Sequence, residues 1–89
     1  MAIDVKEAHV NVPKHNLNRL APTWAEQKQM LIDAVRNLSH VAPKGTNPQG
    51  DFYEVTVQIN NTSGNPVTIV IRWFEYLNSD KVITTAFVL

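Results

Sequence analysis

The spacing of apolar residues changes once along the chain, from a helical period to an alternating one. After Pro22 and Thr23, apolar residues recur every three, four or seven positions, as on one face of an amphipathic helix. Thr23 followed by Glu26 predicts an N-terminal cap, with the Glu26 side chain bonding back to the Thr23 amide. We expect this helix to end at residues 39–41, before Pro43. Its apolar stripe consists of Trp24, Leu31, Ala34, Val35, Leu38 and Val41.

In the last third of the chain, apolar residues alternate with polar ones, which is typical of half-buried strands. Three strands are predicted, at residues 53–60, 67–77 and 81–89. Clusters of turn-forming residues at 61–66 and 78–80 separate them, and turns this short join antiparallel neighbours. The sequence therefore predicts an α+β fold in which N-terminal helical segments pack on a three- to four-stranded antiparallel β-meander.

The turn positions also predict which residues face one another across the meander. A first hairpin centred on Ser63 places Glu54 opposite Arg72, and a second centred on Ser79 places Arg72 opposite Ala86. The same registers give three further pairs: Val55 with Ile71, Val57 with Ile69, and Phe74 with Thr84.

These registers divide the sheet into two different faces. The apolar face, which we expect the helix to cover, consists of Val55, Val57, Ile59, Ile69, Ile71 and Phe87. The opposite face consists of Glu54, Thr56, Arg72, Phe74 and Thr84. Because that second face combines charges, hydroxyls and an aromatic ring, it suits a binding surface better than a core.

The remaining segments carry weaker patterns. Residues 3–12 alternate only in part, so a short strand and an extended arm both fit them. Pro13 disfavours helix at Val12, whereas residues 14–20 predict one short helical turn. Residues 42–51 contain two prolines and two glycines and predict a loop.

Length, cysteine content and charge limit the classes of function. A chain of 89 residues forms one small domain, and the absence of cysteine excludes disulfides, Cys-ligated zinc and thiol catalysis. No apolar run approaches the ~20 residues of a membrane span, so we expect no membrane insertion. The formal net charge of zero argues against RNA or DNA binding through an extensive basic surface, although Lys6, Lys14 and Arg19 can form a local basic site.

The stretch from His9 to Leu17 gathers two imidazoles and one ammonium. Histidine is the usual residue for acid–base chemistry at neutral pH without a metal. RNA supplies its own nucleophile, the ribose 2′-hydroxyl, so cleavage needs only a base, an acid and a donor that stabilises the phosphorane. The residues that match these roles are His9, Lys14, His15, Arg72 and Thr84.

Each of these residues also has a purely structural interpretation. His9 fits a surface or strand histidine, and His15 fits a residue that caps the short turn. Lys14 fits a solvated side chain, whereas Arg72 fits one half of a cross-strand ion pair. Thr84 is a favourable strand residue without any function.

The other titratable residues do not point to a cofactor. His40 lies at the predicted C-terminus of the helix, where its charge suits the helix dipole, so we interpret it as structural. A metal site from His9, His15 and either Asp4 or Glu7 lacks any known ligand spacing. We therefore predict neither a metal nor a cofactor.

Two blocks of the chain are similar to a known family. The run His9-Val10-Asn11-Val12-Pro13-Lys14-His15-Asn16-Leu17, followed by Leu20 and Trp24, resembles the start of bacterial polymorphic toxin domains of the type 35 group. Those toxins begin with a similar His-x-x-x-Pro-Lys-His-Asn element. The ending Ile83-Thr84-Thr85-Ala86-Phe87-Val88 is similar to their last strand, in which a hydroxyl residue lies within an apolar segment. More broadly, a helix followed by a meander resembles the barnase/EndoU/colicin/RelE-like ribonucleases.

The resemblance implies a metal-independent endoribonuclease toxin that occupies residues 1–89 as a single domain. Such toxins form the C-terminal part of larger secreted or cell-surface effectors of contact-dependent inhibition, and they act in the cytoplasm of the target bacterium. RNA, with tRNA as one candidate, is then the substrate. A cognate immunity protein neutralises the toxin, which implies a monomer or a toxin–immunity heterodimer.

The matching positions are His9, Lys14, His15 and Thr84, whereas Arg72 enters through the predicted register. Two other interpretations stay open. The chain fits a non-catalytic binding module, such as an immunity protein or antitoxin that pairs through an exposed strand edge. It also fits a structural domain without activity, in which the histidines are incidental.

Overall fold

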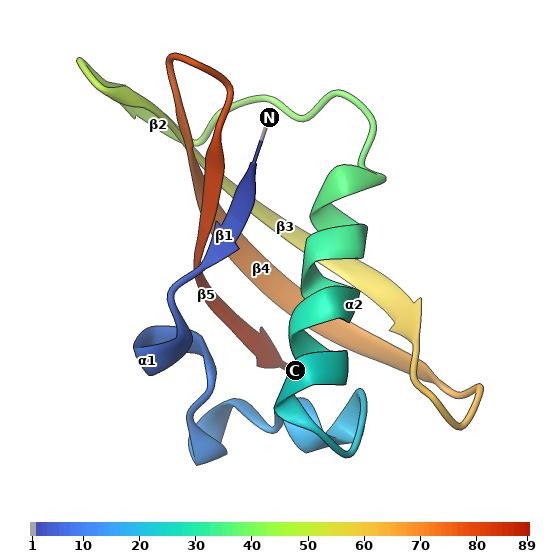
Figure 1. Ribbon diagram of the computed structural model, residues 1–89. Coiled ribbons are helices and arrows are strands. Elements are labelled where there is room, and N and C mark those ends of the chain that lie inside the picture. The colour runs from blue at the N-terminus through green and yellow to red at the C-terminus, as the bar shows by residue number, and fades with distance from the viewer. Residues whose placement is uncertain (1) are drawn as a thin grey trace.

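The computed structural model describes residues 2–89 as an α+β fold, in which one long helix crosses one face of a five-stranded sheet (Figure 1). The strands lie in the order β1-β5-β4-β3-β2. Their bounds are β1 Ile3–Val5, β2 Gly45–Asn47, β3 Gly50–Asn60, β4 Pro66–Tyr76 and β5 Lys81–Val88. The helices are α1 Glu7–Val10, the 3₁₀ turns η1 Pro13–His15 and η2 Leu17–Arg19, and α2 Trp24–Arg36.

The predicted α+β class is confirmed, but the expected sheet of three or four antiparallel strands is wrong in two respects. The sheet has five strands, and it is mixed because β1 runs parallel to β5. Both additional strands are short and lie at the edges. Within residues 2–89, no helix is both long enough and apolar enough to cross a bilayer.

Helix α2 begins where the sequence predicts and ends earlier. The Thr23 hydroxyl accepts a hydrogen bond from the Glu26 amide at 3.3 Å and donates one to the Glu26 carboxylate at 2.9 Å. The reciprocal bond therefore joins the two side chains, instead of reaching the Thr23 amide. The helix ends at Arg36, because Asn37 leaves the helical conformation with φ −90° and ψ 0°. His40 consequently lies exposed in the following loop, and the predicted contact with the helix dipole is wrong.

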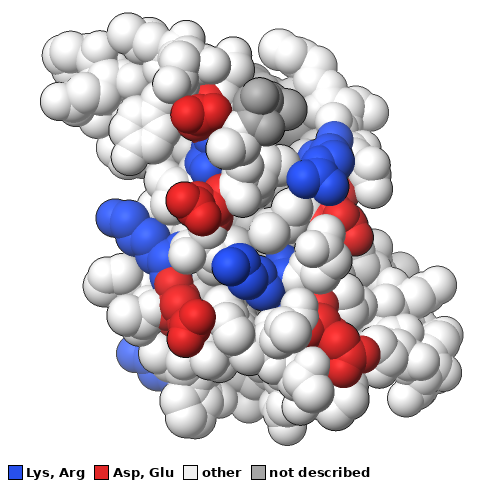
Figure 2. All heavy atoms as spheres, in the orientation of Figure 1, with Lys and Arg blue, Asp and Glu red and all other residues white. Residues whose placement is uncertain are grey.

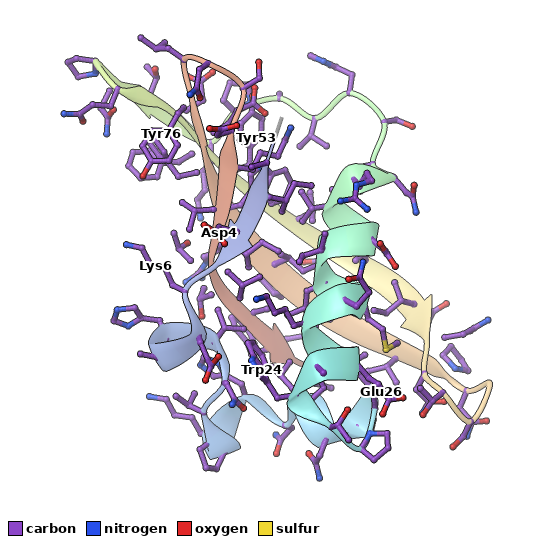
Figure 3. All side chains as sticks on the ribbon, viewed as in Figure 1. Asp4, Lys6, Trp24, Glu26, Tyr53 and Tyr76 are labelled. Carbon is purple, nitrogen blue, oxygen red and sulfur yellow. The ribbon has the colours of Figure 1, made fainter. Side chains whose placement is uncertain are left out.

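The main core lies between α2 and the sheet. Leu31 of α2 is fully buried against Ile69, Ile71 and Ile83 of the central strands. The segment from α1 to η2 closes one end of this core, and it contributes the buried side chains Val10, Leu17 and Leu20. Trp24 ties the two helices together, since its Nε1 donates to the Glu7 carboxylate at 2.9 Å (Figure 3).

The N-terminal segments match the sequence patterns only in part. The short strand that was one interpretation of residues 3–12 is present at Ile3–Val5, but helix α1 follows it at Glu7–Val10. The single turn predicted at 14–20 is present as the two turns η1 and η2, which a left-handed Asn16 separates with φ 57°. Val12 is extended before Pro13, as expected.

The two hairpins differ in how well their registers were predicted. In the first, Glu54 faces Arg72, and Val55 and Val57 face Ile71 and Ile69, as predicted. In the second, the turn is centred on Asn78 instead of Ser79, so that Phe74 faces Val82. A β-bulge at Arg72/Trp73 then shifts the pairing by one residue, and Arg72 faces Thr85. The predicted partners Ala86 and Thr84 are therefore wrong.

The bulge also changes which β5 side chains reach the core. Ala86 and Val88 are buried in the core on the α2 side. Phe87, which we predicted for that face, lies between them and faces the other way. Its ring is on the same side of the sheet as the Arg72 guanidinium. The bulge thus moves one aromatic ring from the expected core to the opposite face.

The predicted loop at 42–51 is also wrong, because it contains β2 and the first residues of β3. The turn between these strands is closed by Asn47, whose Oδ1 accepts from the amides of Gln49 and Gly50 at 2.8 and 3.2 Å. Asn, Pro and Gly mark a turn correctly here, but only three residues pair on either side and Phe52 is the one large apolar residue among them, so no alternating pattern predicts the strands.

Replacing Gly50 with alanine is expected to lower the free energy of unfolding by about 1–3 kcal/mol, the usual cost of overpacking. A Cβ atom at this position would lie 2.0 Å from the carbonyl oxygen of Glu75, so the β3–β4 backbones must separate locally. Urea denaturation of Gly50→Ala would measure the loss. Gly45→Ala is the comparison variant, since a Cβ there meets only the Phe52 ring, at an ordinary contact distance of 3.8 Å. Equal stability of Gly50→Ala and wild type would contradict the close approach.

Candidate functional site

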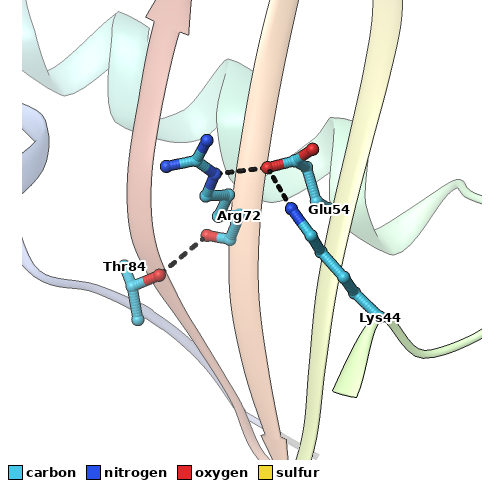
Figure 4. Close-up of polar contacts among 4 residues, drawn as sticks. All are labelled: Lys44, Glu54, Arg72 and Thr84. Atoms are coloured by element: carbon cyan, nitrogen blue, oxygen red, sulfur yellow. Dashed lines mark hydrogen bonds and ion pairs between the residues drawn. The ribbon is translucent and has the colours of Figure 1, made fainter.

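The face of the sheet opposite α2 carries the predicted site. Figure 4 views this face, with α2 behind the strands and the side chains of Lys44, Glu54 and Arg72 in front of them. We call it the open face and define it by the side chains of Phe52, Glu54, Arg72, Phe74, Tyr76 and Phe87. Two cross-strand pairs organise it, Phe52 with Phe74 and Glu54 with Arg72.

Arg72 is held on the open face from two sides. Its Nε donates to Oε1 of Glu54, and the same oxygen accepts from Nζ of Lys44 at 3.2 Å (Figure 4). On the other side, the Arg72 Cζ lies 5.8 Å from the centre of the Phe87 ring, within the range of a cation–π contact. The two terminal nitrogens of Arg72 point away from Glu54, and among residues 2–89 they have no hydrogen-bond partner.

Charge complementarity keeps Glu54 ionised. Hydrogen bonds from Arg72 and then from Lys44 hold the pKa of the Glu54 carboxyl below its usual range, and they outweigh the opposite effect of partial burial. The stabilisation from this carboxylate is fully present above its ordinary pKa and is lost only as the pH falls through the lowered pKa. One carboxylate between two cations leaves this group of three residues with a net positive charge.

His15 reaches the same ring from η1. Its Nδ1 lies 3.1 Å from the carbonyl oxygen of Val10, and its ring centre lies 6.1 Å from that of Phe87. A carbonyl oxygen can only accept a hydrogen bond, so Nδ1 carries the hydrogen. In the neutral imidazole the lone pair is then on Nε2, which is the form that a general base requires.

Two of the five predicted site residues contact the same aromatic ring. His15 and Arg72 both contact Phe87, from η1 and β4 respectively. His9 on α1 and Lys14 on η1 are exposed. Within residues 2–89, neither of these two side chains has a hydrogen bond or an ion pair. Both segments nevertheless pack on β5, the strand that carries Phe87.

Thr84, the fifth predicted residue, lies at the bulge. Its hydroxyl donates to the carbonyl oxygen of Arg72 at 3.3 Å (Figure 4). The contact joins β5 to β4 beside the irregular pairing, where Thr85 takes the position opposite Arg72. The Thr84 hydroxyl therefore supports the backbone that carries Arg72.

No protein-family model, curated protein or solved structure matches this chain.

The alternative metal site of the sequence analysis finds no support in the geometry. Among the described residues, no three histidine or acidic side chains lie close enough together to hold a metal ion. His9 and His15, with Asp4 or Glu7, accordingly form no such group.

Sequence reasoning missed Phe87 and Lys44 as parts of this site, and it treated Glu54 only as an ion-pair partner. Phe87 was assigned to the core because the bulge carries no clear sequence pattern. Lys44 lies just before β2, in the segment that we predicted as a loop. The Glu54–Arg72 pair itself follows from the first hairpin register, whereas no sequence pattern indicates the contact of Lys44 with Glu54.

Proposed function

We propose that this protein is a metal-independent endoribonuclease, used as a toxin in competition between bacteria. The observation that carries the proposal is the convergence of His15 and Arg72 on the ring of Phe87. His15 offers Nε2 as a proton acceptor, and Arg72 offers two terminal nitrogens as donors. A base and a cation that contact the same ring on an open surface supply two of the three groups that cleavage at a phosphodiester with an adjacent 2′-hydroxyl requires, and the third is an acid.

In this proposal, His15 Nε2 takes the proton of the ribose 2′-hydroxyl. The 2′-oxygen attacks the neighbouring phosphorus, and the bond from phosphorus to the 5′-oxygen breaks. Arg72 stabilises the negative charge that develops on the non-bridging oxygens. The leaving 5′-oxygen takes a proton from an acid, for which His9 is the candidate. The products are a 2′,3′-cyclic phosphate and a 5′-hydroxyl, so atoms and charge balance without a metal.

Charge placement favours the open face as the RNA-binding surface. On the α2 side, acidic and basic side chains alternate over the visible surface (Figure 2). On the open face, Lys44 and Arg72 share one carboxylate, so a local positive charge remains although the whole chain is neutral. A small positive patch binds phosphate locally and contributes little to non-specific binding.

The biological part of the proposal rests on the similarity of the His9–Leu17 run to type 35 toxin domains. In this proposal, the protein is delivered as the C-terminal part of a larger secreted or cell-surface effector. It then acts in the cytoplasm of the target cell, with tRNA as a candidate substrate. A cognate immunity protein then forms a heterodimer with the otherwise monomeric toxin.

End-mapping of cleaved RNA tests the reaction class. Incubation of the purified protein with cellular RNA in the presence of EDTA is expected to give fragments with 2′,3′-cyclic phosphate and 5′-hydroxyl ends. His15→Ala is expected to give no such fragments, whereas His40→Ala, at the exposed loop after α2, is expected to cleave like wild type. Failure of the wild type to cleave any RNA would refute the proposal, as would products with 5′-phosphate ends.

A second candidate function is supported by one free strand edge. Strand β2 pairs only with the first residues of β3, Gly50–Phe52. Among the described residues, the outer edge of β3 at positions 53–60 therefore has no strand beside it. An apolar groove lies along this edge, lined by Met30, Ala34, Leu38, Val57 and Ile59 among others. Such an edge suits strand addition by another protein, as in an immunity protein or antitoxin.

Expression of the chain alone in bacterial cytoplasm separates the two candidates. A toxin is expected to arrest growth, with rescue by His15→Ala. A non-catalytic binding module is expected to leave growth unchanged in both forms.

A further inference from the structure

An aromatic cluster lies on the open face, directly beside the Glu54–Arg72 pair. Phe52 faces Phe74 across β3 and β4, and Tyr76 follows Phe74 on the same side of β4. The ring centres of Phe52 and Tyr76 each lie 4.9 Å from that of Phe74, at interplanar angles of 69° and 74°. Both contacts are therefore edge-to-face, and Phe74 holds the two outer rings in place.

The two outer rings remain exposed although they are held. Phe52 and Tyr76 are each 46% exposed, whereas Phe74 between them is only 8% exposed. A glycine lies opposite each outer ring, Gly45 across from Phe52 and Gly50 across from Tyr76. Because glycine has no side chain, neither ring is covered from the neighbouring strand. Figure 3 shows Tyr76 at the end of the sheet that also carries β2.

The aromatic cluster is continuous with the cations of the candidate site. A shallow hollow joins them, and its lining includes Lys44, Phe52, Glu54 and Arg72. Phe52 is the diagonal neighbour of Arg72 across β3 and β4, so their side chains emerge about 7–8 Å apart on the same face. This separation is within the reach of a single nucleotide, measured from its phosphate to its base.

We propose that Phe52 and Tyr76 form a stacking site for an unpaired nucleobase of a single-stranded RNA, whose neighbouring phosphate contacts Arg72 and Lys44. Aromatic rings on an open antiparallel sheet suit unpaired bases, because every base presents a flat face to stack. Rings already fixed by Phe74 lose little conformational freedom when a base binds. The choice of RNA as the ligand rests on the proposed ribonuclease function. The stacking site adds that the RNA substrate is single-stranded.

Binding of an uncleavable oligonucleotide tests this site apart from the chemistry. The probe is a fluorescein-labelled, single-stranded 2′-O-methyl RNA of mixed sequence, in which the nucleophilic hydroxyl is blocked. Fluorescence anisotropy would give its Kd for wild type, and a duplex of the same sequence is the reference ligand. Wild type is expected to bind the single strand more tightly than the duplex.

Phe52→Ala is expected to raise the Kd for the single strand by about 5- to 150-fold, which corresponds to about 1–3 kcal/mol for one stacked base. Tyr76→Ala is expected to act in the same direction. Leu77→Ala is the matched control, because Leu77 is 81% exposed beside Tyr76 and is apolar without a ring. Phe52→Tyr keeps a ring and is expected to bind like wild type, and thermal unfolding of each variant would identify any loss of folding.

The outcomes separate this inference from the proposed function. Wild-type Kd values in folded Phe52→Ala and Tyr76→Ala would overturn the stacking site, even if RNA cleavage continues. A probe that wild type does not bind would also overturn it and would leave the exposed rings to a protein partner. If Phe52→Ala binds the probe much more weakly than wild type, and wild type cleaves no unmodified RNA, the stacking site is supported and the ribonuclease activity is refuted.

Discussion

Replacing His15 with alanine is expected to lower kcat/KM for RNA cleavage by about 100- to 10,000-fold, the usual contribution of one general acid or base. The reason lies in the hydrogen bond from Nδ1 to the Val10 carbonyl, which directs the lone pair of the neutral ring to Nε2. Steady-state cleavage of a defined RNA oligonucleotide would measure the loss. Because His15 is only half-buried, the folded structure is expected to persist.

Two further variants, one at His15 and one at His9, separate the chemical role of these residues from a structural one. His15→Asn places an amide nitrogen near the position of Nδ1, so it can keep the hydrogen bond to Val10 while it removes Nε2. We expect His15→Asn to unfold like wild type and to cleave as slowly as His15→Ala. His9→Ala removes the candidate acid and is expected to lower kcat/KM by a similar factor, and because His9 is exposed on α1 its loss should leave the fold unchanged. Cleavage by His15→Asn at the wild-type rate would exclude Nε2 as the base.

The first hairpin was predictable because two independent patterns agree there. The alternation in β3 and β4 and the turn at residues 61–66 give the same register, so the pairing of Glu54 with Arg72 follows from either. The main helix was predictable from its stripe and from the Thr23 cap, although its end was not. Asn37 leaves the helix while the apolar spacing continues to Leu38 and Val41.

The rest of the site depends on long-range contacts that carry little local pattern. The bulge at Arg72/Trp73 inserts one residue into β5 and thereby turns Phe87 onto the open face. Neither Thr84 nor Thr85 marks this position, because threonine favours any strand. The pairing of β1 with β5 joins residues nearly eighty positions apart through only three residues of strand. The contact that His15 and Arg72 share with Phe87 therefore depends on an arrangement that the sequence pattern did not predict.

Arg72→Ala is expected to lower kcat/KM by about 100- to 1,000-fold, the usual loss when one donor to the developing negative charge is removed. Its Nε is held by Glu54, and its Cζ lies against the ring of Phe87, so the terminal nitrogens are fixed before RNA binds. Fixed donors need no reorganisation during the reaction, which is the condition for a large electrostatic contribution. Single-turnover cleavage of the same RNA would measure the effect on the chemical step.

The matched variants for Arg72 are Arg72→Lys and Glu54→Gln. Lysine keeps the charge but has no fork of nitrogens that can contact Glu54 and a phosphate at once, so Arg72→Lys is expected to restore little of the rate. Glu54→Gln keeps a hydrogen-bond acceptor and removes only the charge, so a smaller loss of cleavage rate is expected.

Because the pKa of Glu54 is held below its usual range, the wild-type ion pair persists as the pH falls through the ordinary carboxyl pKa. Glutamine at position 54 should therefore leave the acid limb of the pH–rate profile unchanged. A shift of that limb in Glu54→Gln would mean that the carboxylate itself exchanges protons in the reaction, and the roles given to His15 and Glu54 would have to be revised.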